Sequence, residues 1–385
     1  MRKLGTVLML TAALGAAVAV YALVRALTPR AAPSVAPQQN QEQHQEQRGE
    51  LHTERGAAAP RAELPSADDV ARLAQRSSVE AVLAQLDRAV ADVDAQGAAA
   101  VRARWLTARS AAHRVLGSFE RALQDVDAAL VLAPDSSEAH YHRARALAAR
   151  LLQTTRARGW SGALASLGDV GVIKGELAAA IALDERNFEA RDEELGILLL
   201  APWPIGNERA AEARIALLAE LDPVRHALWR AQALATDERW TEALELVTHI
   251  ELPEDASRAH LARLTLLHGQ VLQEQRRFRE AAPVYTALLD GVRDVFWYQA
   301  AYESARVRQR GGFELEQALE LLAEYIAAEP VGDFVAPLAS AWHRRGLCFR
   351  DLGRLVEARG AFELGLALFP SDRELAEALA QLKQR

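Results

Sequence analysis

The chain has 385 residues, of which 50% are hydrophobic, and carries a formal net charge of −7. Ala, Leu, Glu and Arg dominate, which favours helices, and no stretch alternates regularly enough to predict a sheet. No large basic block follows the first residues, so nucleic acid is not expected as a partner. The single cysteine, Cys348, excludes an intramolecular disulfide and a cysteine-based metal site, and we interpret it as a packed thiol.

Residues 1–27 are predicted to be a transmembrane anchor or a signal sequence. Two basic residues precede an uncharged, mostly apolar run, Leu4–Val24, and Arg25 ends it. About 20 residues are needed to cross a bilayer as a helix. The small-x-small sequence at Ala17–Ala19 lies inside this run, so an uncleaved anchor is preferred over a cleaved signal. We therefore expect a single-pass protein of the inner (cytoplasmic) membrane with its folded part outside the cytoplasm, or alternatively a secreted or periplasmic protein.

Residues 28–65 are rich in Gln, Glu, Pro and Ala and have few large apolar side chains. Such a segment buries too little surface to offset its ordering entropy, so we expect a disordered linker. Residues 66–97 show a degenerate helical pattern and are predicted to be N-terminal capping helices.

The remaining chain, residues 98–385, contains an internal repeat. Its most complete copy is "WHRRGLCFRDLGRLVEARGAFELGLALFP", which begins at Trp342 and ends at Pro370. Alignment of the recurrent small residue gives intervals of 51, 38, 32, 38, 37 and 40. Such periods are typical of stacked helical hairpins. The aligned positions are Ala122, Ile173, Ala211, Ala243, Ala281, Ala318 and Ala358.

The pattern resembles the tetratricopeptide repeat family, and more loosely its bacterial members that are membrane-anchored or exported. The resemblance implies an all-α fold, a right-handed superhelix of about seven helical hairpins. Small residues would allow the two helices of a hairpin to approach closely, and aromatic residues would fill the remaining space. The matching positions are Ala122, Pro134, Gly269, Ala281, Tyr285, Trp342, Gly346, Phe349, Ala358, Phe362, Gly365 and Pro370.

Two inserts and a C-terminal helix complete the predicted array. The first insert, residues 155–175, has five glycines and Lys174, but the order required of a phosphate loop is missing. We interpret it as a long loop between helices that packs Trp160. The second insert, residues 200–207, holds Trp203 between two prolines, and it is predicted to cover a hydrophobic edge or to protrude as a binding loop. A final capping helix is expected to begin at Ser371.

No catalytic residue, metal site or cofactor is predicted. His140 and His142 are two residues apart and therefore diverge on a helix, and His113 takes an aromatic position of the repeat. The most direct interpretation is a non-enzymatic, membrane-anchored scaffold that binds a peptide or a partner protein. The alternatives are an enzyme or small-ligand protein that uses residues 155–210, and an accessory factor in an envelope complex, secretion or cytochrome assembly.

The resemblance also implies where a partner binds, because in this family the first helix of each hairpin lines the concave surface. Basic and amide groups outnumber acids there, which favours an acidic peptide or a C-terminal carboxylate. Alternatively, the arginines pair with Glu274 and Asp351 across the groove. The oligomeric state is not indicated by the sequence. The predicted groove residues are Arg104, Thr107, Arg114, Arg263, Gln270, Gln273, His343 and Arg350.

Overall fold

The computed structural model describes residues 64–94, 99–165, 167–201, 205–332 and 335–383, and these form 17 helices and no strand. The predicted anchor and nearly all of the predicted linker lie outside the described residues. Among the helices that are described, none is long and apolar enough to span a bilayer.

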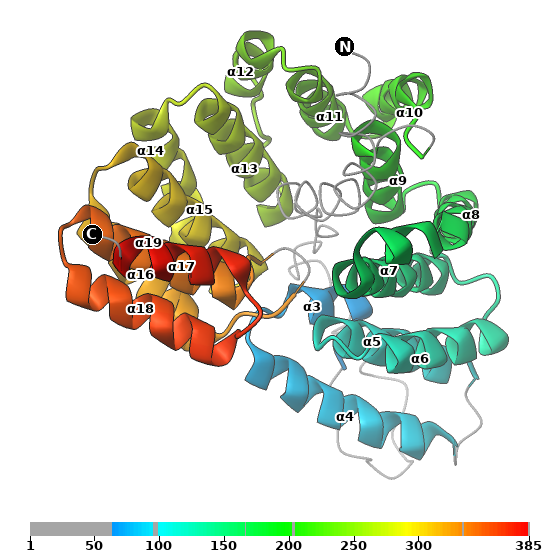
Figure 1. The fold of residues 1–385 in the computed structure, drawn as a ribbon. Coiled ribbons are helices and arrows are strands. Elements are labelled where there is room, and N and C mark those ends of the chain that lie inside the picture. The colour runs from blue at the N-terminus through cyan, green and yellow to red at the C-terminus, as the bar shows by residue number, and fades with distance from the viewer. Residues whose placement is uncertain (1–63, 95–98, 166, 202–204, 333–334, 384–385) are drawn as a thin grey trace, which may run out of the picture.

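Fourteen of the helices form seven consecutive hairpins, which follow one another around an arc (Figure 1). The first helix of each hairpin lies toward the centre of the arc and the second lies outside. The pairs are α5 (Ala99–Val115) with α6 (Phe119–Leu132), α7 (Ser137–Ala165) with α8 (Leu167–Leu183), α9 (Phe188–Leu200) with α10 (Glu208–Leu221), α11 (Pro223–Thr236) with α12 (Trp240–Thr248), α13 (Arg258–Glu274) with α14 (Phe278–Leu289), α15 (Val295–Gly311) with α16 (Leu315–Ala328), and α17 (Leu338–Asp351) with α18 (Leu355–Leu368).

The predicted register of the repeat is confirmed. The seven aligned small residues are all buried, and even Ile173, the largest, is only 3% exposed. A Cβ atom on Gly346 would lie 2.2 Å from the ring of Phe362, and one on Gly269 would lie 2.3 Å from the ring of Tyr285. The glycines are therefore required because an aromatic ring from the second helix occupies the space of their missing side chains.

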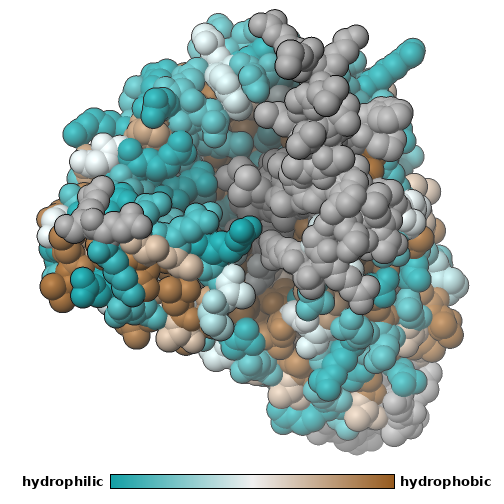
Figure 2. Space-filling model, in the orientation of Figure 1, coloured by the Kyte–Doolittle hydropathy of each residue, from teal (hydrophilic) through white to brown (hydrophobic). Residues whose placement is uncertain are grey.

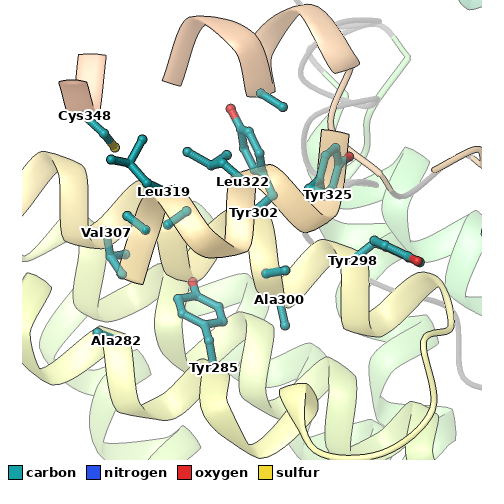
Figure 3. Packing of buried hydrophobic residues seen from close by; sticks show 14 of the residues in the cluster. Ala282, Tyr285, Tyr298, Ala300, Tyr302, Val307, Leu319, Leu322, Tyr325 and Cys348 are labelled. Carbon is teal, nitrogen blue, oxygen red and sulfur yellow. The ribbon is translucent and has the colours of Figure 1, made fainter. Parts of the chain in front are cut away.

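The largest hydrophobic cluster joins the last three hairpins (Figure 3). Tyr325 of α16 packs edge-on against Tyr298 and at a tilt against Tyr302, both on α15, with ring centroids 6.0 and 5.8 Å apart. Its hydroxyl donates a hydrogen bond to the carbonyl oxygen of Ala336, at 2.5 Å. Because α15 is surrounded by α13, α14, α16 and α17, it is buried along almost its whole length.

The interpretation of residues 155–175 as a long loop is wrong. α7 continues to Ala165 and α8 begins at Leu167, so almost the whole segment is helical. Val170, Ile173 and Leu177 lie three and four residues apart and form one face, which packs into the core of this hairpin. Burial of that face outweighs the low helix propensity of the glycines. The side chain of Trp160 and the whole of Trp203 lie outside the described residues.

Helices at both ends complete the array. α3 (Ala67–Arg72) and α4 (Arg76–Asp94) precede the first hairpin, and α19 (Arg373–Lys383) follows the last. α19 was expected, but its N-terminal cap is Asp372 rather than Ser371, because the amide of Leu375 donates to the Asp372 carboxylate at 3.0 Å. The view in Figure 2 is mostly hydrophilic, with apolar residues gathered at the lower left, over the end that holds α18. The exposed apolar residues of α18 are Leu355, Val356, Leu364 and Leu368.

We predict that Gly346→Leu destabilises the last hairpin far more than Arg354→Leu does. The leucine side chain would displace the ring of Phe362 and cost about 1–3 kcal/mol or more. The side chain of Arg354 is 40% exposed at the turn between α17 and α18, and its ion pairs there contribute little. Thermal unfolding of both variants measures the difference. Equal shifts in melting temperature would show that the helix crossing is not at Gly346.

Candidate functional site

The inner face of the array is the candidate site. It is built from the first helices α5, α7, α9, α11, α13, α15 and α17, and polar side chains from neighbouring first helices meet on it. These side chains pair across successive hairpins, as the following clusters show.

The central cluster surrounds the carboxylate of Asp192 on α9. Its Oδ1 accepts a hydrogen bond from the indole of Trp229 at 2.6 Å and forms an ion pair with Arg263 at 2.7 Å. Its Oδ2 forms an ion pair with Arg225. The Arg263 guanidinium also lies over the Trp229 ring, 4.1 Å from its centroid. Burial acts to raise the pKa of Asp192, but the two guanidiniums and the indole outweigh it, so the pKa lies below its usual value. Asp192 is therefore a buried anion that holds α9, α11 and α13 together.

Asp222 adds a second carboxylate to this cluster. It caps α11 by accepting from the amide of Arg225 at 2.9 Å, and it pairs with the Arg225 guanidinium at 3.2 Å. The imidazole Nε2 of His260 on α13 lies 3.2 Å from the same carboxylate. Burial opposes ionisation, yet the contacts with His260 and Arg225 keep the pKa of Asp222 well below its usual value.

Amide and charged groups continue the pairing along α13, α15 and α17. The Gln273 amide donates to the hydroxyl of Tyr285 at 2.7 Å and to Glu303 at 3.1 Å, and Glu303 forms an ion pair with Arg306 at 2.7 Å. Arg306 in turn donates to the side-chain amide oxygen of Gln273 at 3.1 Å. One turn further along α15, Gln309 accepts from Arg344 at 2.5 Å and donates to Asp351 at 2.8 Å. The junctions of α13 with α15 and of α15 with α17 therefore each have their own polar contacts.

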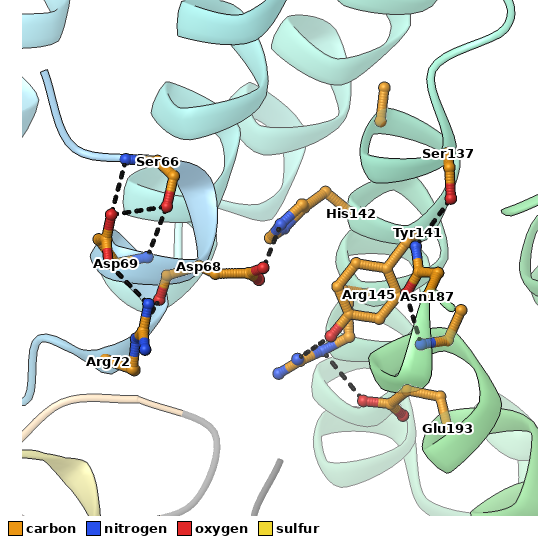
Figure 4. Close-up of polar contacts among 12 residues, drawn as sticks. Ser66, Asp68, Asp69, Arg72, Ser137, Tyr141, His142, Arg145, Asn187 and Glu193 are labelled. Atoms are coloured by element: carbon orange, nitrogen blue, oxygen red, sulfur yellow. Dashed lines mark hydrogen bonds and ion pairs between the residues drawn. The ribbon is translucent and has the colours of Figure 1, made fainter. Parts of the chain in front are cut away.

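At the other end, Arg145 of α7 donates to the hydroxyl of Tyr141 at 2.7 Å and lies 3.4 Å from the carboxylate of Glu193 on α9 (Figure 4). Arg145 is only 1% exposed. As in the Asp192 cluster, a buried arginine and a buried carboxylate from two first helices form an ion pair. Here the arginine is on the earlier helix, α7, and the carboxylate is on the later one, α9.

The predicted groove residues divide into two groups. Arg104 is exposed, and Gln270, His343 and Arg350 are half-buried. Arg350 pairs at 2.7 Å with Asp351, its neighbour in sequence, so this contact is local and does not cross the groove as the alternative expected. The other four, Thr107, Arg114, Arg263 and Gln273, are at most 2% exposed.

As side chains offered to solvent, those four predictions are wrong. The inner helices pack closely, so polar groups here are used within the protein. Arg263 binds Asp192 of another hairpin rather than Glu274, and Thr107 donates to the carbonyl oxygen of Ala103 on its own helix. Sequence reasoning also missed the residues that carry the network, among them Asp192, Arg225 and Glu303. A signal existed for Arg225, because it precedes Arg263 by the same 38 residues that separate Ala243 from Ala281.

α3 also lies on the inner face, across the first two hairpins (Figures 1 and 4). Its buried residues, Ala67 and Val70, share a hydrophobic cluster with Ala108 and Ala111 of α5. Asp68 lies 3.6 Å from the imidazole of His142 on α7. Residues 66–97 were predicted to cover one end of the array, and this part of the segment covers the surface expected to bind a partner.

The residues that follow α3 reach the opposite end of the arc. The amide of Val331, after α16, donates to the carbonyl oxygen of Ala74 at 2.6 Å, and Gln75 pairs with Pro330 as an antiparallel bridge. The Gln75 amide also donates to the hydroxyl of Tyr298 on α15 at 3.1 Å. We name Leu64–Gln75 the strap, because it joins the first hairpins to the sixth and closes the arc.

We predict that Asp192→Leu destabilises the chain by about 3–5 kcal/mol, since it leaves two buried guanidiniums without their carboxylate. Glu194→Leu is the matched control on the same helix, because the described ion pair of Glu194 is with the half-exposed Arg214. That change is expected to cost about 1 kcal/mol or less. Urea unfolding compares the two. A small loss for Asp192→Leu would contradict a structural role for the buried anion.

The strap contact predicts a pH dependence. Burial, followed by repulsion from Asp68, raises the pKa of Glu138 on α7 to about 7, with Arg104 opposing the shift and Asp69 adding to it. The folded state therefore binds this proton more tightly than the unfolded state. The resulting stability is complete below pH 4.5 and is lost as the pH rises through 7.

Urea unfolding between pH 4.5 and 8 tests this for the native chain and for Glu138→Gln. The native chain should lose stability relative to the variant across that interval. Parallel profiles would mean that Glu138 titrates normally.

Comparisons with known proteins show only distant likeness. No protein-family model matches the chain, and no curated protein does. Among solved structures, Pseudomonas aeruginosa pilF is 14% identical, with a TM-score of 0.34, over 72% of this chain and 96% of that chain. The TPR domain of P58(IPK) is 15% identical, with a TM-score of 0.25, over 80% and 93%. The APC/C hetero-tetramer Cut9–Hcn1 is 12% identical, with a TM-score of 0.29, over 74% and 70%.

The assignment therefore rests on the geometry within the chain, because the superpositions are too distant to support it. Seven consecutive hairpins each bury the residue at the aligned position, and in two of them a glycine of the first helix faces an aromatic ring of the second. The resemblance predicted from the sequence is confirmed: the chain is a tetratricopeptide-type helical solenoid.

Proposed function

We propose that the chain is a non-enzymatic interaction scaffold whose inner face receives an extended peptide or a segment of a partner protein. One observation carries the proposal. The amide oxygens of Gln232 and Gln270, and both amide atoms of Gln299, are buried and have no hydrogen-bond partner among the residues that the structure describes. Buried polar groups are nearly always paired, so an unpaired set on one surface points to a bound molecule that completes it.

The register places these amides on the inner face. Gln299 lies seven residues before Arg306 on α15, and Gln270 lies three residues before Gln273 on α13, so each shares a helix face with an inner residue. Gln232 lies seven residues after Arg225 on α11 in the same way. A side-chain amide both donates and accepts, which suits the main chain of an extended peptide.

The charged groups on the inner face support a scaffold rather than a reaction. Asp192 is held in ion pairs between hairpins, and Glu303 pairs with Arg306 on its own helix and accepts a hydrogen bond from Gln273 of the preceding hairpin. Burial raises the pKa of the Cys348 thiol to about 12, so it remains protonated at neutral pH and is a poor nucleophile. Lys174 donates to the carbonyl oxygen of Ile205 at 2.5 Å, so this amine has a structural contact of its own.

The accessible inner cations favour an acidic partner. Arg104 is exposed on α5, and Arg350 is half-buried on α17 beside a single carboxylate, Asp351. Guanidinium groups bind carboxylates through paired, charge-assisted hydrogen bonds. We therefore propose an acidic peptide or a C-terminal carboxylate as the ligand.

The proposed scaffold is tethered by residues 4–24 to the inner membrane, with the solenoid outside the cytoplasm. The length and apolar character of that run support an anchor.

We predict that Gln299→Leu reduces the recovery of partners from solubilised membranes without lowering the melting temperature. Leucine removes two unpaired buried polar atoms, so stability should be kept or raised, while a bound peptide would lose its hydrogen bonds. Gln381→Leu, at an exposed position of α19, is the control. Unchanged recovery with Gln299→Leu would remove the support for binding at these amides.

A second arm tests the sign of the partner's charge with Arg104→Glu and Arg350→Glu combined. Arg263 is unsuitable for this purpose because its reversal would break the Asp192 cluster. Arg209→Glu, on the exposed outer surface of α10, is the control. Full recovery of partners by the double variant would contradict an acidic ligand.

We predict that the native chain stays with membranes through a carbonate wash, because the apolar run at residues 4–24 is long enough for a helix that spans the bilayer. A soluble form whose N-terminus begins near Ala19 or Ala22 would instead show a cleaved signal.

A further inference from the structure

Within the described residues, the strap is the one segment that occupies the inner face without belonging to a hairpin. Its helix, α3, presents Ala67 and Val70, three residues apart and both fully buried. They rest on a floor of small residues, Ala108, Ala111 and Ala112. A floor of alanines admits a second helix at close range, because no long side chain stands between the two backbones.

Charged groups surround this floor. Arg104 and Glu138 lie close enough to interact electrostatically, and His142 faces Asp68 at 3.6 Å. On α3, Ser66 and Asp69 form a capping box: the Asp69 amide donates to the Ser66 hydroxyl at 3.2 Å, and the Ser66 amide donates to Asp69 at 3.1 Å. The seated element is thus a short capped helix with an acidic first turn and a narrow apolar face.

We propose that the surface beneath α3 is an acceptor site for a short partner helix, and that the strap is its competitor within the same chain. The partner helix would carry small apolar residues three apart and an acidic first turn, as α3 does. The inference rests on the proposed scaffold function and adds a second site to it. Because the strap also closes the arc, displacement of α3 opens the solenoid.

The contacts of the strap suit an exchangeable element. α3 has six residues and two fully buried side chains, which is much less than any hairpin buries. The other end is held by the Val331–Ala74 hydrogen bond, the Gln75–Pro330 bridge and the Gln75–Tyr298 contact. Elements with few buried contacts open at the lowest free energy. An attached competitor still occupies its site, because tethering gives it a high effective concentration.

The first experiment measures binding of a labelled peptide, residues Leu64–Gln75, to the full chain by fluorescence anisotropy. Val70→Glu in the chain places a charge at the buried contact of α3 and should undock the strap. This variant is expected to bind the peptide about tenfold or more tightly than the native chain, because the tethered competitor is removed. Val131→Glu, at an 83% exposed position of α6, should bind it like the native chain.

A folded Val70→Glu chain that gains no affinity would overturn the proposal. So would equal binding of a peptide that itself carries Val70→Glu, since the apolar face would then not be recognised.

A second experiment compares the oxidised and reduced forms of a disulfide variant, and it applies if Val70→Glu does not fold. Gln75 and Pro330 are paired across an antiparallel bridge, where Cα atoms are close enough for a disulfide. The double variant Gln75→Cys with Pro330→Cys should bind the peptide more weakly when oxidised than when reduced. Cys348 is buried and does not compete. Identical affinities in the two redox states would overturn the proposal.

These measurements need no cellular partner. They can therefore succeed or fail independently of the membrane pull-down, which tests the amides and cations of the inner face.

Discussion

The close crossing of the two helices in each hairpin is the constraint on which the rest of the structure depends. Where Gly346 faces Phe362 and Gly269 faces Tyr285, the aromatic ring lies in the space that a side chain would fill. Such a hairpin is flat, with one apolar face left over, and that face is buried only when another hairpin stacks on it. Stacking in turn brings the first helices of successive hairpins side by side and produces the inner face.

Polar pairing on the inner face follows from this packing. Once the first helices lie side by side, their inward polar groups lose water and must find partners in the next hairpin. Asp192 does so with Arg225 and Arg263, and Glu303 does so with Gln273. Replacement of such pairs by apolar residues can be neutral in other proteins, so their net contribution to stability is modest. We infer that they fix the register between hairpins, because each anion fits only the cations of its own neighbours.

The sequence predicted the parts of this structure that depend on local spacing. The seven crossing positions, the C-terminal helix and the burial of Cys348 follow from residue type and period within one hairpin. The partners of Arg263 and Gln273 could not be predicted, because they depend on which side chains of another hairpin lie opposite. The glycines of residues 155–175 suggest a loop, but the apolar spacing of Val170, Ile173 and Leu177 is that of a helix, and burial of this face decides the structure.

The turn between the two helices of a hairpin is also only partly predictable from the sequence. Gly117 and Gly353 adopt the left-handed conformation five residues before the crossing alanine, with φ of 81° and 76°. Glu238 and Arg276 take the same conformation at the same position, both with φ of 59°. Glycine marks the turn in two copies and is absent from the other two, so the stacking of the hairpin, rather than residue preference, imposes the turn there.

Closure of the arc by the strap distinguishes this solenoid from an open groove. The strap covers part of the inner face at the first two hairpins and touches the sixth, so access to the groove and the shape of the array are coupled. The amide of Val331, whose only described acceptor is the carbonyl oxygen of Ala74, reports this closure directly. Native-state hydrogen exchange should find this amide protected in the full chain and exposed in Val70→Glu, with the amides of α17 unchanged. Exchange of the Val331 amide in the native chain at the rate of an unprotected loop would show that the arc is open.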